Sequence, residues 1–195
     1  MMENGKISLL FSGGVESVLL YYLIVHNHFC SYEKFNLYLL HKHNNPVNLV
    51  VNLYNHLKEL WNDTISTLNV INFNSSIREH KKIGNTLAVL NNEYDIIYYG
   101  LNKYPPNIKP NHSVNTFTED SISNLYKIYN KVNLPFIDFT KDKVIELYYK
   151  NNIQHILPIT ISCGSDKERL CKLCFNCRER IWAYKKLELK LEMGI

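Results

Sequence analysis

Short apolar runs alternate along the chain with longer segments in which apolar residues recur every three or four positions. The continuous runs are typical of strands buried in a parallel sheet, and the wider spacing is typical of helices with one apolar face. The pattern predicts strands at Ile7–Phe11, Phe35–His41, Asn69–Phe73, Asp95–Gly100 and Phe136–Phe139. It predicts helices at Glu16–His28, after Pro46, near Ile77–Asn91, near Glu119–Lys131, at Lys141–Lys150 and from about Asn176 to Leu191.

This alternation of strands and helices implies an α/β fold, with one Rossmann-like parallel sheet covered by helices on both faces. The length of 195 residues and the apolar fraction of 46% suit a single domain, 1–195, with a buried core. Such sheets bind ligands at the carboxyl ends of their strands, beside the point where the strand order reverses. The Pro- and Asn-rich stretch Asn102–Thr118 follows one of these ends and is long enough for a working loop.

Composition and charge narrow the class of protein. No apolar run reaches the roughly 18 residues of a membrane span. Met1–Lys6 leads directly into a strand-like run without a signal-peptide pattern, so we expect a cytoplasmic protein with no membrane partner. The formal net charge of +4 is too small to indicate a nucleic-acid partner.

A glycine loop, Ser12-Gly13-Gly14-Val15-Glu16-Ser17, follows the first predicted strand. Two glycines allow a tight turn and let the backbone approach a ligand closely. Because the next residues begin a helix, its free N–H groups face the same point and form an anion site. The hydroxyls of Ser12 and Ser17 would add donors for phosphate oxygens. An ordinary strand–helix turn, with Ser12 as a cap, is the alternative interpretation.

Four of the five cysteines lie in one short segment: Cys163, Cys171, Cys174 and Cys177. This spacing suits one metal ion held by four thiolates, and Zn²⁺ favours such a closed, structural site. We expect the site within residues 162–180. An iron–sulfur cluster uses the same ligand set, and redox chemistry by a C-x-x-C pair is a further alternative.

The two motifs together resemble those of the N-type ATP pyrophosphatases, the PP-loop superfamily. The glycine loop is similar to the superfamily's Ser-Gly-Gly-x-Asp-Ser, and the cysteine segment ending at Arg180 is similar to that of the 7-cyano-7-deazaguanine (preQ0) synthase family of queuosine biosynthesis. The segments Leu134–Lys141, Pro158–Cys163 and Gly100–Asn102 extend the resemblance over most of the chain.

Three departures from the family pattern accompany this resemblance. Glu16 stands where the family has Asp, which keeps the carboxylate but adds a methylene, and Ile161 stands where the family usually has Trp. The loop after Asn102 lacks the Asp-rich and Gly-Tyr-Pro pattern associated with substrate recognition. The ATP half of the chain therefore resembles the family more closely than the half that would select the acid.

The resemblance implies an ATP-dependent ligase that adenylates a carboxylate and releases pyrophosphate. The implied substrate is 7-carboxy-7-deazaguanine, with ammonia as the nitrogen donor that gives first an amide and then, by dehydration, a nitrile. It also implies Mg²⁺ with the ATP, Zn²⁺ on the four cysteines, and a homodimer. Glu16, directed toward Mg²⁺, and Lys141, facing the phosphates, would be catalytic. The residues expected to contact ATP are Phe11, Ser12, Gly13, Gly14, Val15, Ser17, His43 and Gly100.

Lys141 is also singled out by its position. A lysine in the first turn of a helix is unfavourable unless an anion lies nearby, which favours a phosphate-facing role over that of an ordinary surface lysine.

Two rival functions stay open. One is a PP-loop enzyme with another substrate, such as an antiviral-system relative or an enzyme of tRNA thiolation. The other is a non-catalytic nucleotide-binding module stabilised by zinc.

Overall fold

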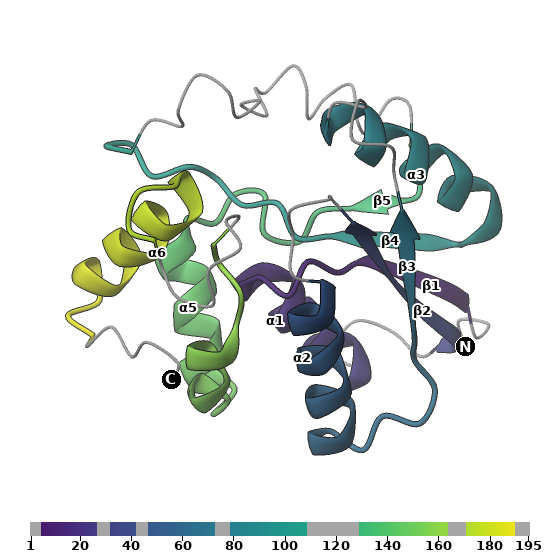
Figure 1. Ribbon diagram of the computed structural model, residues 1–195, viewed down its shortest axis with the longest axis horizontal. Coiled ribbons are helices and arrows are strands. Elements are labelled where there is room, and N and C mark those ends of the chain that lie inside the picture. Colours follow the sequence, from purple (N-terminus) through teal and green to yellow (C-terminus); the bar gives the residue numbers. More distant parts are fainter. Residues whose placement is uncertain are drawn as a thin grey trace.

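The computed structural model describes residues 5–26, 32–41, 47–72, 79–108, 129–163 and 171–189. Five parallel strands form one sheet in the order β3-β2-β1-β4-β5 (Figure 1). The strands are β1 (Gly5–Leu10), β2 (Tyr32–His41), β3 (Thr67–Asn72), β4 (Ile96–Tyr99) and β5 (Val132–Asn133). The helices are α1 (Val15–Val25), α2 (Val47–Leu60), α3 (Glu79–Glu93), α5 (Lys141–Lys150) and α6 (Phe175–Lys186), with a 3₁₀ helix at Gln154–Ile159. The predicted α/β class is confirmed.

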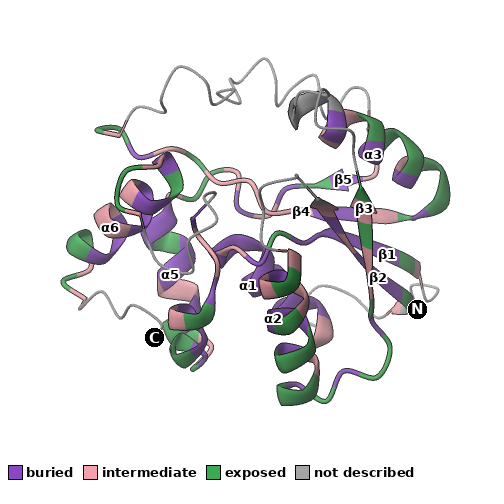
Figure 2. Ribbon diagram, in the orientation of Figure 1, coloured by how far each residue is buried: buried purple, intermediate pink, exposed green. Residues whose placement is uncertain are grey.

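Alternation along the strands gives the sheet two buried faces, each covered by helices. Ile7 and Leu9 of β1 point into a core shared with α1, α2 and α5, whereas Leu10 points into a smaller core under α3. Figure 1 shows α3 on one side of the sheet and α1 and α2 on the other, and Figure 2 shows buried positions along the central strands. The central strands thus bury side chains on both faces, as is typical of a parallel sheet.

The strand order reverses at β1, which lies between β2 and β4. The chain leaves β1 through α1 to reach β2 on one side, and returns later to β4 on the other side. The carboxyl ends of β1 and β4 therefore flank the switch point, where open α/β sheets bind ligands. Helices α5 and α6 pack against each other beside the first turn of α1 (Figure 1).

The prediction of a strand at Phe136–Phe139 is wrong. This segment forms turns, with Ile137 N–H donating to Leu134 O and Phe139 N–H to Phe136 O. The fifth strand is the shorter β5, which ends two residues before Pro135 because proline lacks the N–H that a ladder needs. An apolar residue stands at position 136 because the side chain of Phe136 is buried in the core with residues of α5, although the segment is not a strand.

The last predicted helix is too long. Helix α6 ends at Lys186, and Glu188 follows with a positive φ of 54° that breaks the helical path. The N–H of Leu189 then returns to Tyr184 O at 2.9 Å, which satisfies a carbonyl of the last turn. The helix predicted near Glu119–Lys131 falls mostly outside the described residues, and 129–131 are not helical.

The loop expected at Asn102–Thr118 is described only as far as Ile108. Among the described residues, none of the helices combines the length and the apolar character that crossing a bilayer would need.

Candidate functional site

The glycine loop lies at the carboxyl end of β1, between the strand and the first turn of α1. The N–H of Ser12 donates to Ser17 Oγ at 3.2 Å, and Ser17 Oγ donates to Gly14 O at 3.1 Å. Ser17 therefore closes the loop onto the helix that follows. The first N–H groups of α1 have no partner within the helix and carry its positive dipole end, so this turn is suited to an anion.

The two glycines of the loop have different reasons to be glycine. Gly13 has φ +74°, which favours glycine, and a Cβ there would lie 3.2 Å from Ile161 and 3.3 Å from Leu53. Gly14 has φ −72° and ψ 166°, a conformation open to any residue. A Cβ on Gly14 would meet Ser12 Oγ at 3.2 Å, the movable end of a side chain. The fold thus requires Gly13, whereas it tolerates a small side chain at Gly14.

Gly100 brings the end of β4 against the start of α1. A Cβ at this position would lie 2.8 Å from Glu16 Cβ and 3.2 Å from the backbone nitrogen of Ser17. The first distance is shorter than real Cβ contacts and the second is tight, so the two backbones meet this closely because residue 100 has no side chain. Gly100 therefore sets how closely the end of β4 can approach the first turn of α1.

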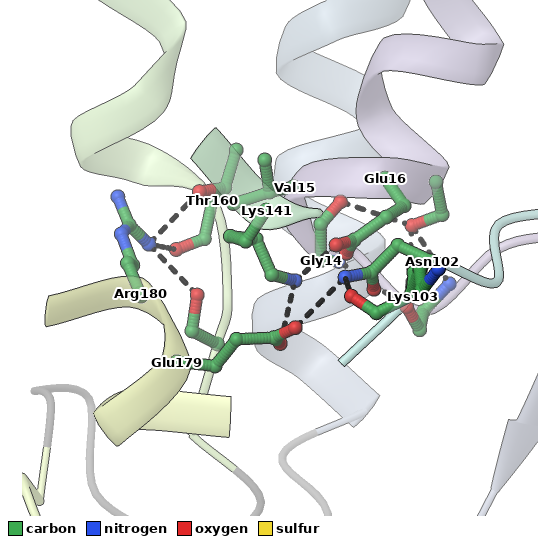
Figure 3. Close-up of polar contacts among 12 residues, drawn as sticks. Gly14, Val15, Glu16, Asn102, Lys103, Lys141, Thr160, Glu179 and Arg180 are labelled. Carbon is green, nitrogen blue, oxygen red and sulfur yellow. Dashed lines mark hydrogen bonds and ion pairs between the residues drawn. The ribbon is translucent and has the colours of Figure 1, made fainter. Parts of the chain in front are cut away.

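Lys141 joins three elements in a buried ion cluster (Figure 3). Its Nζ forms an ion pair with Glu16 Oε1 of α1, and a second one with Glu179 Oε2 of α6 at 3.2 Å. Asn102, just after β4, donates its amide to Glu179 Oε1 at 2.8 Å. Glu16, Lys141 and Glu179 are 8%, 6% and 2% exposed, so the charges interact with little solvent between them.

The electrostatics of this cluster favour a protonated lysine. Burial alone would lower the pKa of Lys141, but the carboxylates of Glu16 and Glu179 outweigh burial and raise it. Burial and the nearby charge of Glu16 raise the pKa of Glu179. When all three side chains are ionised, the cluster carries a net charge of −1 beside the turn suited to an anion.

Arg180 organises the segment that leads to the first cysteine. Its Nη1 donates to Thr160 O at 3.1 Å and to Thr160 Oγ1 at 3.0 Å (Figure 3). The same Nη1 donates to Ser162 Oγ at 2.9 Å, and Nη2 donates to Leu157 O. Between these anchors, Ile161 N–H donates to Gly13 O at 2.8 Å. A single buried guanidinium thus shapes the chain that supports the glycine loop.

The four predicted cysteines come together beside the start of α6. The Sγ atoms of Cys163, Cys171, Cys174 and Cys177 lie within 4.8 Å of one another. Cys174 is the N-cap residue of α6, and its backbone N–H donates to Cys171 Sγ at 3.3 Å. That hydrogen bond lowers the pKa of Cys171 to about 6, while burial raises the pKa of Cys177. Cys171 is therefore favoured as thiolate, the form that binds metals.

The spacing of these sulfurs fits a single metal ion. With Zn–S bonds of about 2.3 Å, a tetrahedral site places its sulfurs about 3.8 Å apart. The Cys171 and Cys177 sulfurs are already 3.8 Å apart. A four-iron cluster binds each thiolate to a different iron, which requires a wider separation of the four sulfurs. The donor set and its compactness therefore fit one tetrahedral ion.

The structure brings together most of the residues that the sequence singled out. Glu16 and Lys141 contact each other directly, Gly100 touches the start of α1, and the four thiols converge. Phe11 is different, because its ring is buried in the core against Tyr21 and Tyr54 and only its backbone leads into the loop. His43 lies outside the described residues.

Sequence reasoning missed Glu179 and gave no role to Asn102. Glu179 lies between Cys177 and Arg180, within a segment that the sequence analysis interpreted only as a metal site. The sequence offers one sign of its role, an acidic residue on a helix that packs against another helix, α5. The partner Lys141 is distant in the sequence, so the spacing of residues could not reveal the pair.

Gly100→Ala tests the close approach of β4 to α1. Because the new methyl would overlap Glu16, we expect a loss of about 1–3 kcal/mol in the free energy of unfolding. Gly84→Ala is the matched control, since a Cβ there meets only Tyr129 Oη at 3.6 Å and alanine favours helix. Denaturant unfolding of both variants measures the difference. Equal stability of the two would contradict the packing described.

Elemental analysis tests the cysteine cluster. We expect about one metal ion per chain, lost in Cys177→Ser because Cys177 is one of the four grouped thiols, and retained in Cys30→Ser because four thiolates already complete a tetrahedral site. Removal of the ion by a chelator should lower the melting temperature. Four iron atoms per chain with a visible absorption band, or no metal in the protein as isolated, would contradict the single-ion site.

No protein-family model and no curated protein matches this chain. Among solved structures, the U34-tRNA thiolase NcsA from Methanococcus maripaludis with its [4Fe-4S] cluster aligns with 99% of this chain and 76% of its own. The sequence identity is 14% and the TM-score is 0.40. A similarity at this level carries no argument about function.

Proposed function

We propose that the chain is an ATP-dependent enzyme of the PP-loop type, which binds the phosphates of ATP at the glycine loop. The observation that carries the proposal is the meeting of the α1 N-terminus with the buried, protonated Lys141 beside the ends of β1 and β4. Backbone N–H groups and an ammonium at one point are the donors that a triphosphate needs.

Magnesium is part of this proposal because of the charge at the site. The cluster of Glu16, Lys141 and Glu179 has a net charge of −1 when ionised, which would repel free ATP. Mg²⁺ on the triphosphate would reverse this repulsion, and Glu16 is the carboxylate placed to contact it. Lys141, freed from Glu16, would then turn toward a phosphate oxygen. We therefore expect nucleotide to bind as its magnesium complex.

The proposed reaction is activation of a carboxylate. A carboxylate resists attack because its carbon is electron-rich and its leaving group would be oxide. Attack of the acid's oxygen on the α-phosphorus of ATP forms an acyl adenylate and releases pyrophosphate, and an amine can then displace AMP. The N–H groups of the loop and Lys141 would hold the departing pyrophosphate, so positioning and charge stabilisation supply the catalysis.

The finer assignment follows the sequence resemblance to preQ0 synthases. It names 7-carboxy-7-deazaguanine as the acid, ammonia as the donor and a homodimer as the assembly. Zn²⁺ is the proposed ion of the cysteine cluster, supported by the compact spacing of its sulfurs. Such an ion, held by four thiolates, has no open position for a substrate and would act structurally.

One observation favours a second candidate, a nucleotide-binding module without turnover. The ammonium that would neutralise a phosphate is already held by two carboxylates, Glu16 and Glu179. If these contacts persist with nucleotide bound, Lys141 cannot stabilise charge on the phosphates.

Pyrophosphate release distinguishes the two candidates. The purified protein is incubated with MgATP, ammonia, and either 7-carboxy-7-deazaguanine or no acid. Release that requires the acid supports the synthase-like enzyme, and release with other acids supports the enzyme class alone. Binding of MgATP with no release under any condition supports the module. Absence of MgATP binding would contradict both.

A graded series at Gly14 tests the phosphate site itself. Because the fold tolerates a Cβ at this position, Gly14→Ala should keep the melting temperature nearly unchanged, and the melting temperature of Gly14→Val shows whether the larger side chain still fits the fold. MgATP affinity should fall from glycine to alanine to valine, by about tenfold or more for valine, as side-chain atoms fill the space for a phosphate. Equal affinities across the series, measured by calorimetry, would remove the loop from the binding site.

A further inference from the structure

We infer that Glu179 and Arg180 are positioning residues that couple the cysteine cluster to the glycine loop, so that metal binding and nucleotide binding strengthen each other. The inference rests in part on the proposed nucleotide site, but the coupling can be measured without nucleotide. Two consecutive buried charges in the second turn of α6 point to two different parts of the site (Figure 3).

The N-terminal end of α6 carries part of the cysteine cluster. Cys174 is the N-cap residue of the helix and Cys177 lies in its first turn, so two of the four thiols belong to α6. The other end of α6 is held separately, because Lys186 forms an ion pair with the buried Asp142 of α5 at 2.6 Å. Loss of the ion would therefore release the first turns of α6 and leave its last turn anchored.

The first connection runs through Glu179 to the start of α1. Glu179 Oε2 is 3.2 Å from Lys141 Nζ, and Lys141 contacts Glu16. Asn102 holds the other oxygen of Glu179 at 2.8 Å. If Glu16 turns toward Mg²⁺, Glu179 is the carboxylate that keeps Lys141 in the site.

The second connection runs through Arg180 to the glycine loop. The guanidinium binds Thr160 and Ser162 on both sides of Ile161, whose N–H donates to Gly13 O at 2.8 Å. Cys163, a member of the cluster, follows directly. The segment 160–163 thus contacts α6, the glycine loop and the metal ligands at once, and it fixes their relative positions.

These contacts imply a reciprocal linkage. An ion that orders the first turns of α6 also orders Lys141 and the support of Gly13, which lowers the cost of binding a triphosphate. By thermodynamic necessity, a nucleotide that tightens the loop then raises the affinity for the ion by the same factor. The linkage requires Arg180 and Glu179 and no contact between nucleotide and metal.

The first test uses hydrogen–deuterium exchange in the full-length protein without nucleotide. In the metal-loaded Arg180→Gln variant, we expect the Ile161 amide to exchange about tenfold faster than in the wild type, because the variant loses charge-assisted hydrogen bonds. Metal content should stay at the wild-type value. Lys185→Gln, which removes an exposed charge from the same helix, should leave the exchange unchanged.

The second test is hydrogen–deuterium exchange after removal of the metal. In metal-free wild type, peptides covering 157–163 and 11–17 should lose protection while β1 and β2 keep theirs. Loss of protection confined to 171–178 would overturn the inference. If metal removal unfolds the whole sheet, the loaded Arg180→Gln variant decides instead, and unchanged exchange at Ile161 in that variant would overturn the inference.

The third arm measures the linkage itself, as the rate of metal transfer to a chromophoric chelator with and without MgATP. We expect MgATP to slow transfer severalfold in the wild type and in Lys185→Gln, and to have little effect in Arg180→Gln or Glu179→Leu. Glu179→Gln, which keeps the shape of the side chain and one of its two acceptor oxygens but loses the charge, should give an effect between those of the wild type and Glu179→Leu. If MgATP binds the wild type but leaves the transfer rate unchanged, the coupling is wrong. If MgATP does not bind while the exchange results hold, the proposed function and the linkage to nucleotide fail, and only the structural coupling of the cysteine cluster to the glycine loop stands.

Discussion

One ammonium, that of Lys141, holds together three helices that come from different parts of the sequence. It lies between a carboxylate of α1 and a carboxylate of α6, and is itself carried by the first turn of α5. A buried charge without partners would be costly, so this lysine can be buried only because Glu16 and Glu179 are there. The position of the three helix ends around the switch point follows from that requirement. The same requirement explains why a lysine is tolerated at a helix N-terminus, where the dipole disfavours it.

The ion cluster also limits what the site can bind. With two carboxylates and one ammonium, it disfavours a bare anion, and a phosphate ligand must arrive with its own cation. In the function proposed above, Glu16 would leave Lys141 for the cation and the ammonium would turn to the phosphates. Glu179, which accepts a hydrogen bond from Asn102, would remain as the partner of Lys141. Arg180 and Glu179 of α6 connect the glycine loop on one side to the cysteine cluster on the other.

Patterns among residues close in the sequence predicted the secondary structure, the glycine loop and the thiol cluster, because these features depend on neighbouring residues. The alternation of apolar runs indicated the parallel α/β fold, and the glycines and cysteines marked the loop and the thiol cluster. The ion cluster was only half predicted, because Glu16 and Lys141 are 125 residues apart and neither spacing nor periodicity pairs distant charges. Glu179 was missed for the same reason. The strand predicted at Phe136–Phe139 failed because burial of Phe136 in the core produces the same apolar signal as a strand.

The central claim is that the turn after β1 binds a triphosphate with the help of Lys141. A crystal structure of the protein with Mg²⁺ and a non-hydrolysable ATP analogue tests it most directly. The account predicts phosphate oxygens within hydrogen-bond distance of the backbone N–H groups of Gly13 to Val15, and Lys141 Nζ turned from Glu16 to a phosphate. A nucleotide bound elsewhere, or a Lys141 that still contacts both carboxylates with the analogue in place, would contradict it.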